Sequence, residues 1–249
     1  MKNRKLIYIL LAALIIPFSG CQKEYEDESK ITYFPLFEME GESEIIHTMG
    51  VPYTDGTVTA TEEGKPLEVS VHVIGDVTGY SGTTVNVDVI DKYDITYSAT
   101  NADGYVGTTT RIVYIAPPTG DLVSSLEGIY LSSIQRTPSF AVIPQYTSLK
   151  YIYIWKTEDN KFEISCALGG YYSIARNYGY DFAFQGAVIT ANNIPAGDIT
   201  ISQAASPGFG NVADITDFKV DAVNKKITFT STADFDNGVF HVQLEQVQY

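Results

Sequence analysis

The residues of this chain that are best suited to recognition are aromatic, and they gather in two short stretches. The stretch GGYYSIARNYGYDFAF, from Gly169 to Phe184, holds six aromatic residues and three glycines in sixteen positions. The stretch YIYIWK, from Tyr151 to Lys156, alternates aromatic residues with isoleucine. Flat aromatic faces pack against the C–H faces of sugar rings, while amides and charged groups order the sugar hydroxyls. The two stretches are therefore a candidate glycan-binding surface.

In the YIYIWK stretch, one strand face carries two tyrosines and Trp155, and the other face carries two isoleucines. Because isoleucine is the better core residue, we expect the Tyr-Tyr-Trp face to be exposed to solvent. The alternative is that large aromatic side chains fill the core and rim of a small β-barrel, and the burial of their rings decides between the two. The predicted ligand-binding residues are Trp155, Tyr153, Tyr171, Tyr172, Tyr178, Arg176 and Asn177.

The sequence carries no signature of a catalytic site. Its histidines, His47, His72 and His241, lie far apart, and none is flanked by a nucleophile motif. The motifs GxSxG and HExxH and the phosphate-binding loop are absent from the sequence. A pair of glycosidase carboxylates would leave no mark, because such residues meet only in the folded protein. We expect a protein without catalytic activity, cofactor or metal.

Two weaker chemical signals have structural explanations. DFDNG, from Asp234 to Gly238, begins like a calcium loop, with two carboxylates two residues apart and a turn glycine. It lacks the later acidic ligand of an EF-hand loop, and the same residues favour a hairpin turn. Cys166 shares a predicted strand side with Phe162 and Ile164, so we expect it to be a buried, small apolar residue.

Residues 1–20 have the organisation of a signal peptide, with three basic residues before an apolar run from Leu6 to Phe18. The following Ser-Gly-Cys resembles the lipobox of bacterial lipoproteins, in which the cysteine thiol receives a diacylglycerol and becomes the new N-terminus. Phe18 departs from the aliphatic residue that is usual in this motif. The resemblance implies lipidation of Cys21, and two or three acyl chains anchor a protein stably. The alternative is an ordinary signal peptide or a short anchor helix, with Cys21 incidental.

Residues 21–30 form a predicted acidic tether that contains QKEYEDES. A Gln-Lys-acidic run directly after a lipidated cysteine resembles the lipoprotein export signal of Bacteroidetes. The resemblance implies a protein that is anchored in the outer membrane and faces the cell exterior. The alternative is a solvated acidic spacer without an export role.

The composition indicates a folded all-β protein. The 249 residues are 45% apolar and 12% aromatic, and Thr, Tyr, Val and Ile, which fit pleated surfaces, are abundant. The formal net charge of −14 repels phosphate backbones, and no basic stripe reverses this sign locally. We therefore expect no nucleic-acid partner.

Strand patterns occupy two segments that a proline pair separates. Residues 31–116 contain alternating runs such as LEVSVHVIGDV and TTVNVDVID. Pro117 and Pro118 cannot donate ladder hydrogen bonds, so residues 117–120 are a predicted linker. Residues 121–249 contain about eight further strand patterns, which predict an antiparallel β-barrel, with a second β-sandwich as the alternative. The patterns are GIYLSSIQR, LKYIYIWKT, KFEISCA, YDFAFQGAVIT, DITISQ, FKVDAV, KKITFTST and GVFHVQLEQV.

Three segments of the first domain, YTDGTVTATEEGK, ITYSATNADGY and RIVYI, resemble the bacterial Ig-like domains of Bacteroidetes surface lipoproteins. The resemblance implies a seven-strand β-sandwich that acts as a spacer or docking module. In the second domain, LEGIY, the GGYY stretch, SPGFG and VFHVQLEQV resemble the C-terminal domains of BT_2262-like lipoproteins, whose barrels are similar to calycins.

The second resemblance implies a setting and no mechanism, because the family has no settled activity. Such domains accompany polysaccharide-uptake systems with TonB-dependent transporters and SusD-like partners. We therefore expect a non-catalytic surface lipoprotein that binds a polysaccharide or a transporter partner. The alternative from another class is a structural or adhesive protein that engages protein partners, and a third is an unrecognised glycan-active enzyme.

Overall fold

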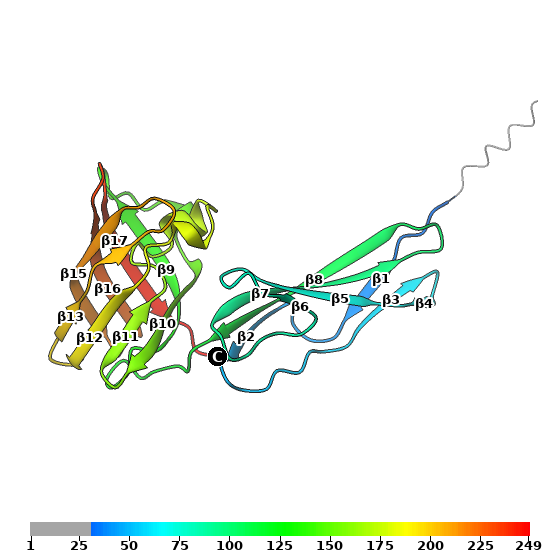
Figure 1. The fold of residues 1–249 in the computed structure, drawn as a ribbon, viewed down its shortest axis with the longest axis horizontal. Coiled ribbons are helices and arrows are strands. Elements are labelled where there is room, and N and C mark those ends of the chain that lie inside the picture. Colours follow the sequence, from blue (N-terminus) through cyan, green and yellow to red (C-terminus); the bar gives the residue numbers. More distant parts are fainter. Residues whose placement is uncertain (1–30) are drawn as a thin grey trace, which may run out of the picture. The chain divides into compact units, whose positions relative to one another are not determined.

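The structure is a computed structural model that describes residues 31–249. The predicted signal peptide and the acidic tether, including Cys21, lie outside the described residues. Residues Phe34–Tyr249 form one structural unit, which contains a first domain, called the Ig-like domain after the resemblance of its sequence, and a C-terminal domain (Figure 1). Strands account for nearly all of the regular secondary structure in both domains, so the predicted all-β fold class is confirmed.

The Ig-like domain contains two sheets, with strand orders β1-β3-β4 and β2-β8-β7-β5-β6. Strand β2 pairs with β8 in parallel, and the other pairs are antiparallel. The strands are β1 (Leu36–Met39), β2 (Glu44–Thr48), β3 (Val58–Glu62), β4 (Lys65–Leu67), β5 (Ser70–Gly75), β6 (Ser81–Gly82), β7 (Asp91–Thr100) and β8 (Val106–Ala116). In the described part of the chain this domain has one strand more than the seven that the resemblance implied.

The core of the Ig-like domain follows from the alternation along β7. Tyr93, Ile95 and Tyr97 are buried on one side of this strand, and they pack with Val73 of β5 and Val113 of β8. Burial of a large apolar side chain stabilises a fold by about 1.5–3 kcal/mol. The period-2 pattern therefore places the hydrophobic face of the five-stranded sheet towards the core.

One predicted strand of this domain is wrong. Residues 83–90, which include the alternating valines of TTVNVDVID, form turns and irregular chain. The side-chain oxygen of Asn86 accepts the backbone N–H of Asp88 at 3.1 Å, and such a local bond competes with extended structure. Val85 and Val87 still pack on the core, whereas Val89 is exposed. The alternation identified buried valines without showing that they belong to a strand.

The C-terminal domain is one curled sheet of nine antiparallel strands in the order β13-β12-β11-β10-β9-β17-β16-β15-β14 (Figure 1). An antiparallel bridge between Gln185, just before β12, and Ala205 of β14 joins the two ends of the curl. The predicted barrel is therefore present as a strongly curled half-barrel. The strands are β9 (Gly128–Arg136), β10 (Leu149–Glu158), β11 (Lys161–Ile164), β12 (Ala187–Asn193), β13 (Asp198–Ile201), β14 (Ala204–Ala205), β15 (Val212–Asp221), β16 (Lys226–Ala233) and β17 (Val239–Gln246).

Three short helical turns interrupt the C-terminal sheet. They are the 3₁₀ turn η1 (Pro144–Tyr146), the π-helical turn η2 (Tyr171–Ala175) and the 3₁₀ turn η3 (Tyr180–Phe182). The prediction that Phe182 belongs to a strand is wrong, because η3 occupies this position and β12 begins only at Ala187. Gly179 and Gly186 on either side have positive φ values of 91° and 76°, which bend the chain out of a strand path.

Candidate functional site

The prediction of a solvent-facing Tyr-Tyr-Trp stripe on β10 is wrong. Tyr153 is only 7% exposed and forms a hydrophobic cluster with Ile129 and with Tyr114 and Ala116 of the Ig-like domain. Tyr151 and Trp155 are half-buried and pack against the same cluster. The two isoleucines of the stretch lie in the C-terminal core, as expected. The alternation of one strand does not reveal that a second domain covers its outer face.

Polar contacts accompany this interdomain cluster. Lys150 Nζ lies 2.6 Å from Glu44 Oε1, and the hydrogen bond raises the pKa of Lys150. The rings of Tyr114 and Tyr151 meet edge to face, with centroids 4.7 Å apart. Burial raises the pKa of Tyr153 well above its ordinary value, so its hydroxyl stays protonated. The interface fixes the Ig-like domain against one side of β10.

The tyrosines of the GGYY stretch divide into structural and exposed members. Tyr171 is 6% exposed, Tyr172 is half-buried, and Tyr178 is 48% exposed. The guanidinium of Arg136 lies 5.2 Å from the Tyr171 ring centroid and 5.8 Å from that of Tyr172. It lies at similar distances from the rings of Phe235 and Phe240. Tyr171 and Tyr172 therefore belong to an aromatic cluster around the half-buried guanidinium of Arg136, as the alternative of aromatic side chains in the core and rim predicts.

Arg176 supports that cluster. Its Nη1 donates a hydrogen bond of 2.8 Å to the hydroxyl of Tyr146, and the Tyr171 hydroxyl lies 3.2 Å from the same oxygen. These bonds, from Tyr171 first and then from Arg176, lower the pKa of Tyr146. Asn177 and Tyr178 follow directly and are exposed. Arg176 is exposed as well, but its guanidinium is bonded to Tyr146; the other two exposed residues of the prediction are Asn177 and Tyr178.

A cavity of about 360 Å³ lies between the two domains and contains both of these residues. The Ig-like domain contributes the turn after β5 together with Lys92 and Tyr114, and the C-terminal domain contributes β10 and the segment from η2 to η3. The lining residues are Asp76, Val77, Lys92, Tyr114, Lys150, Tyr151, Ile152, Tyr153, Ser165, Cys166, Ser173, Ile174, Asn177, Tyr178, Gly179, Tyr180 and Ala183. We call this space the interdomain cavity.

The interdomain cavity combines aromatic faces with charged and amide groups. Burial raises the pKa of Tyr180 to about 12, so its hydroxyl is protonated at neutral pH and can both donate and accept a hydrogen bond. Burial opposes the charge of Lys92, but its hydrogen bonds to Asp76 and Asp94 raise its pKa above the ordinary value. Sequence reasoning missed Asp76, Lys92 and Lys150, because their common feature is the packing of two domains and no motif records it.

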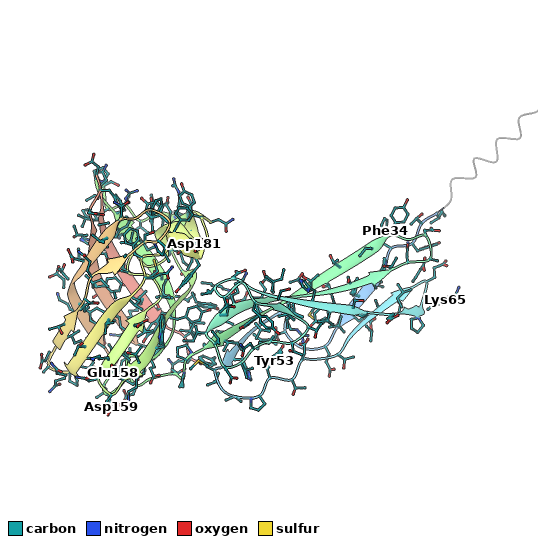
Figure 2. The ribbon with its side chains drawn as sticks, in the orientation of Figure 1. Phe34, Tyr53, Lys65, Glu158, Asp159 and Asp181 are labelled. Carbon is teal, nitrogen blue, oxygen red and sulfur yellow. The ribbon has the colours of Figure 1, made fainter. Side chains whose placement is uncertain are left out.

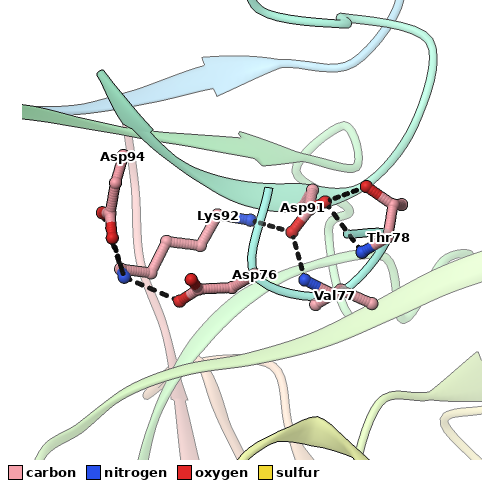
Figure 3. A network of polar contacts seen from close by, with 6 residues as sticks. All are labelled: Asp76, Val77, Thr78, Asp91, Lys92 and Asp94. Carbon is pink, nitrogen blue, oxygen red and sulfur yellow. Dashed lines mark hydrogen bonds and ion pairs between the residues drawn. The ribbon is translucent and has the colours of Figure 1, made fainter. Parts of the chain in front are cut away.

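Asp91 lies behind the residues of the Ig-like domain that line the interdomain cavity, and Figure 3 shows its polar contacts. Its buried carboxylate accepts the backbone N–H groups of Val77 at 2.8 Å and of Lys92 at 2.7 Å. It also accepts the N–H and hydroxyl of Thr78, at 3.1 and 2.6 Å. Nearby, Lys92 Nζ lies 2.7 Å from Asp76 Oδ2. Asp91 therefore holds the turn that presents Asp76 and Val77 to the cavity.

We expect Asp91→Asn to lower the free energy of unfolding by about 2 kcal/mol. Both oxygens of the Asp91 carboxylate accept hydrogen bonds, and the amide nitrogen that replaces one of them in asparagine is a donor and cannot accept these bonds. Urea denaturation followed by circular dichroism measures this change. Asp88→Asn is the matched control, since Asp88 is exposed and its substitution should change stability by less than about 0.5 kcal/mol. Equal stability of both variants would contradict the assigned role of Asp91.

A second cavity, of about 570 Å³, lies over the outer face of β9, β17, β16 and β15. Its lining is rich in hydroxyl and amide groups, among them Ser133, Thr230 and Gln243. His241 in this cavity stacks on Phe140, with ring centroids 4.3 Å apart and planes at 14°. None of the predicted ligand-binding residues lines it, so the interdomain cavity is the better match to the sequence prediction.

The two weaker signals have structural roles. Asp234 Oδ1 accepts hydrogen bonds from Asn211 Nδ2 at 2.9 Å and from the Val212 N–H at 3.0 Å. Cys166 is a buried thiol whose pKa is raised by burial. Within residues 31–249, no three His, Cys, Asp or Glu side chains form a group that could hold a metal ion. The same residues contain no helix with the length and apolarity that crossing a membrane requires.

Comparison with known proteins identifies both domains. A model of the bacterial surface protein Ig-like domain matches residues 37–115, and a C-terminal-domain family model matches residues 119–246. A comparison with curated proteins finds no match. The crystal structure of the lipoprotein BT2262 from Bacteroides thetaiotaomicron is similar, with 27% identity and a TM-score of 0.56 over 86% of this chain and 100% of that one. The chain belongs to the family of Bacteroidetes surface lipoproteins that join a bacterial Ig-like domain to a BT_2262-like C-terminal domain.

Proposed function

We propose that the protein is a non-catalytic lipoprotein, anchored through Cys21 in the outer membrane and facing the cell exterior, that binds a short glycan segment in its interdomain cavity. The lipoprotein relative and the surface Ig-like family support the cellular setting. The Ser-Gly-Cys ending of the signal peptide and the acidic tether support the anchor and the export. In this role the protein is an accessory component of a polysaccharide-uptake system, next to a TonB-dependent transporter and a SusD-like protein.

The single observation that carries glycan binding is the position of Tyr178. This residue is 48% exposed and lines the interdomain cavity together with Asn177, its neighbour in the sequence. The same cavity contains the cations of Lys92 and Lys150 and the carboxylate of Asp76, which suit the hydroxyl groups of a sugar. Its volume of about 360 Å³ lies within the range of small-ligand sites, about 300–1,000 Å³.

The lining of the interdomain cavity supports a binding role over a catalytic one. Glycosidases use two carboxyl groups that flank the scissile bond. Among the described residues that line the cavity, Asp76 is the single carboxylate, and its oxygen is paired with Lys92. A general acid and a second carboxylate therefore have no counterparts on this cavity wall.

The burial of the other tyrosines favours a second candidate function. A flat sugar platform needs two exposed, coplanar rings, but Tyr153 and Tyr171 are buried. The Tyr172 and Tyr178 rings are 5.8 Å apart and tilted by 35°. These features suit a structural or adhesive protein that engages protein partners. The exposed Tyr178 in a polar cavity is the reason that we place glycan binding first.

A glycan array probed with residues 31–249 tests the proposal. We expect binding to a defined sugar, and Tyr178→Ala should weaken the affinity about tenfold, since the stacking contact is lost. Tyr105→Ala is the matched control, because Tyr105 is exposed to a similar degree but does not line the cavity, and this variant should bind like the wild type.

Two results would contradict this assignment. Absence of binding to every glycan on the array would favour the structural or adhesive function. Undiminished binding by Tyr178→Ala, together with a loss in His241→Ala, would instead assign the sugar to the second cavity on β9, β15, β16 and β17.

A further inference from the structure

Four large apolar side chains are exposed together near the first described residues of the Ig-like domain. Phe34 is 63% exposed, Leu36 66%, Tyr105 53% and Val106 60%. Figure 2 shows Phe34 projecting from the end of the domain at which the described chain begins. We call these four residues the tip patch. Exposed apolar groups that gather in one place mark an interaction surface more often than scattered ones do.

The tip patch is assembled by two segments that are distant in sequence. The rings of Phe34 and Tyr105 have centroids 5.7 Å apart. Pro35 packs on Gly107 so closely that a Cβ at this glycine would lie 3.1 Å from three carbons of the proline ring. Because Gly107 has no side chain, Pro35, directly before β1, can pack on the backbone at the start of β8. These contacts hold Phe34 next to Tyr105, and Leu36 and Val106 are exposed on the same two segments.

The chain length to Cys21 determines what this patch can reach. Cys21 and Phe34 are thirteen residues apart, so a fully extended chain spans at most about 47 Å between them. If Cys21 carries acyl chains, the tip patch is confined to a thin layer of solution next to the bilayer. Such confinement gives a high effective concentration of lipid surface, and even a weak contact then becomes populated.

We propose that the tip patch inserts into the interfacial region of the bilayer that holds the acylated Cys21. This proposal rests on the proposed lipid anchor. Tyrosine and phenylalanine suit the boundary between headgroups and acyl chains, because an aromatic body is buried there while the tyrosine hydroxyl stays hydrated. The full sequence has a net charge of −14, and removal of the basic signal peptide makes the chain more acidic, so anionic lipid does not attract it and the contact is apolar and insensitive to salt. The anchor and the tip patch together would orient the Ig-like domain on the membrane.

The test uses the full-length protein, purified from membranes and reconstituted into phosphatidylcholine vesicles. An environment-sensitive fluorophore is attached at Thr108→Cys, an exposed position on β8 near the patch, or at Val223→Cys in the exposed β15–β16 turn as control. Because the thiol of Cys166 is buried, the fluorophore reacts with the introduced cysteine and not with Cys166. Vesicles with brominated acyl chains should quench the label at position 108 and not the label at position 223.

Removing the patch sharpens the test. In the Thr108→Cys background, Phe34→Ser with Tyr105→Ser should lower the ratio of inserted to free label about tenfold or more, since two large apolar groups are lost. Tyr178→Ala should leave the quenching unchanged. Both altered side chains of the patch are exposed, so the fold is retained, and circular dichroism verifies this.

Three results would overturn the proposal, and each has a different meaning. Mass spectrometry that finds no lipid on Cys21 would remove the anchor and the insertion together. Lipid on Cys21 without quenching at position 108 would remove the insertion and leave the anchor intact. A blue shift at position 108 without quenching by brominated lipid would assign the patch to a protein contact, such as a second copy of this chain.

Discussion

Asp55→Ala is expected to lower the free energy of unfolding of the Ig-like domain by about 3–5 kcal/mol, because it leaves a buried arginine without its counterion. The side chain of Arg111 on β8 is only 1% exposed, and its Nη1 forms an ion pair with Asp55. Its Nη2 donates to the backbone carbonyl of Glu40, and the hydroxyls of Tyr53 and Tyr97 donate to the Asp55 carboxylate. The network ties β8 to the chain that precedes β3.

Urea denaturation followed by circular dichroism measures the Asp55→Ala effect, and a double variant tests its cause. The Asp55→Ala variant leaves the Arg111 guanidinium buried without a counterion. The double variant Asp55→Ala with Arg111→Met removes this charge, so it should be more stable than Asp55→Ala alone. Asp76→Ala is the control, because its ion pair with Lys92 is 48% exposed on the aspartate side and should contribute less than about 1 kcal/mol. A double variant that is less stable than Asp55→Ala would show that the Arg111 charge is not the source of the loss.

The second large effect is expected at Gly169, where Gly169→Ala should lower the free energy of unfolding by about 2–4 kcal/mol. A Cβ at this position would lie 2.7 Å from Ser132 Oγ and 2.8 Å from Val242 Cγ1, inside the core of the C-terminal sheet. The backbone φ of +64° adds strain for any side chain. Both costs arise from one methyl group, so the GGYY stretch needs glycine here for packing as well as for conformation.

Gly186→Ala separates these two costs. Gly186 has a φ of +76°, but a Cβ there would meet no atom within 4 Å. This variant should therefore lose only the conformational part, about 1–2 kcal/mol. Thermal and urea unfolding of both variants measure the difference, and an equal loss in the two would show that close packing at Gly169 is unimportant.

The sequence predicted the local elements of the C-terminal domain well, because period-2 alternation between turn residues records which side of a strand is buried. GIYLSSIQR corresponds to β9, and the pattern around KKITFTST corresponds to β16. The pattern failed where side chains form local hydrogen bonds or where glycines redirect the chain. Asn86 folds TTVNVDVID into a turn, and Gly179 with Gly186 keeps YDFAF out of a strand.

The candidate site was predictable only in part, for a different physical reason. Tyr178 and Asn177 were identified, because an aromatic and amide-rich loop is visible in the sequence. Tyr153 was assigned to solvent because one strand carries no information about the domain that covers it. Lys92 and Asp76 were missed because they reach the interdomain cavity through the packing of two domains. Local patterns predict burial within a sheet, whereas interfaces between domains depend on contacts that are distant in sequence.

The most direct test of glycan binding in the interdomain cavity is a crystal structure of residues 31–249 soaked with the sugar that the array selects. We predict density for a sugar ring against the Tyr178 face, with hydroxyl groups within hydrogen-bond distance of Asn177 and of Asp76 or Lys92. Density for the sugar at the second cavity beside His241, or an interdomain cavity without sugar at a concentration that saturates binding in solution, would contradict the account.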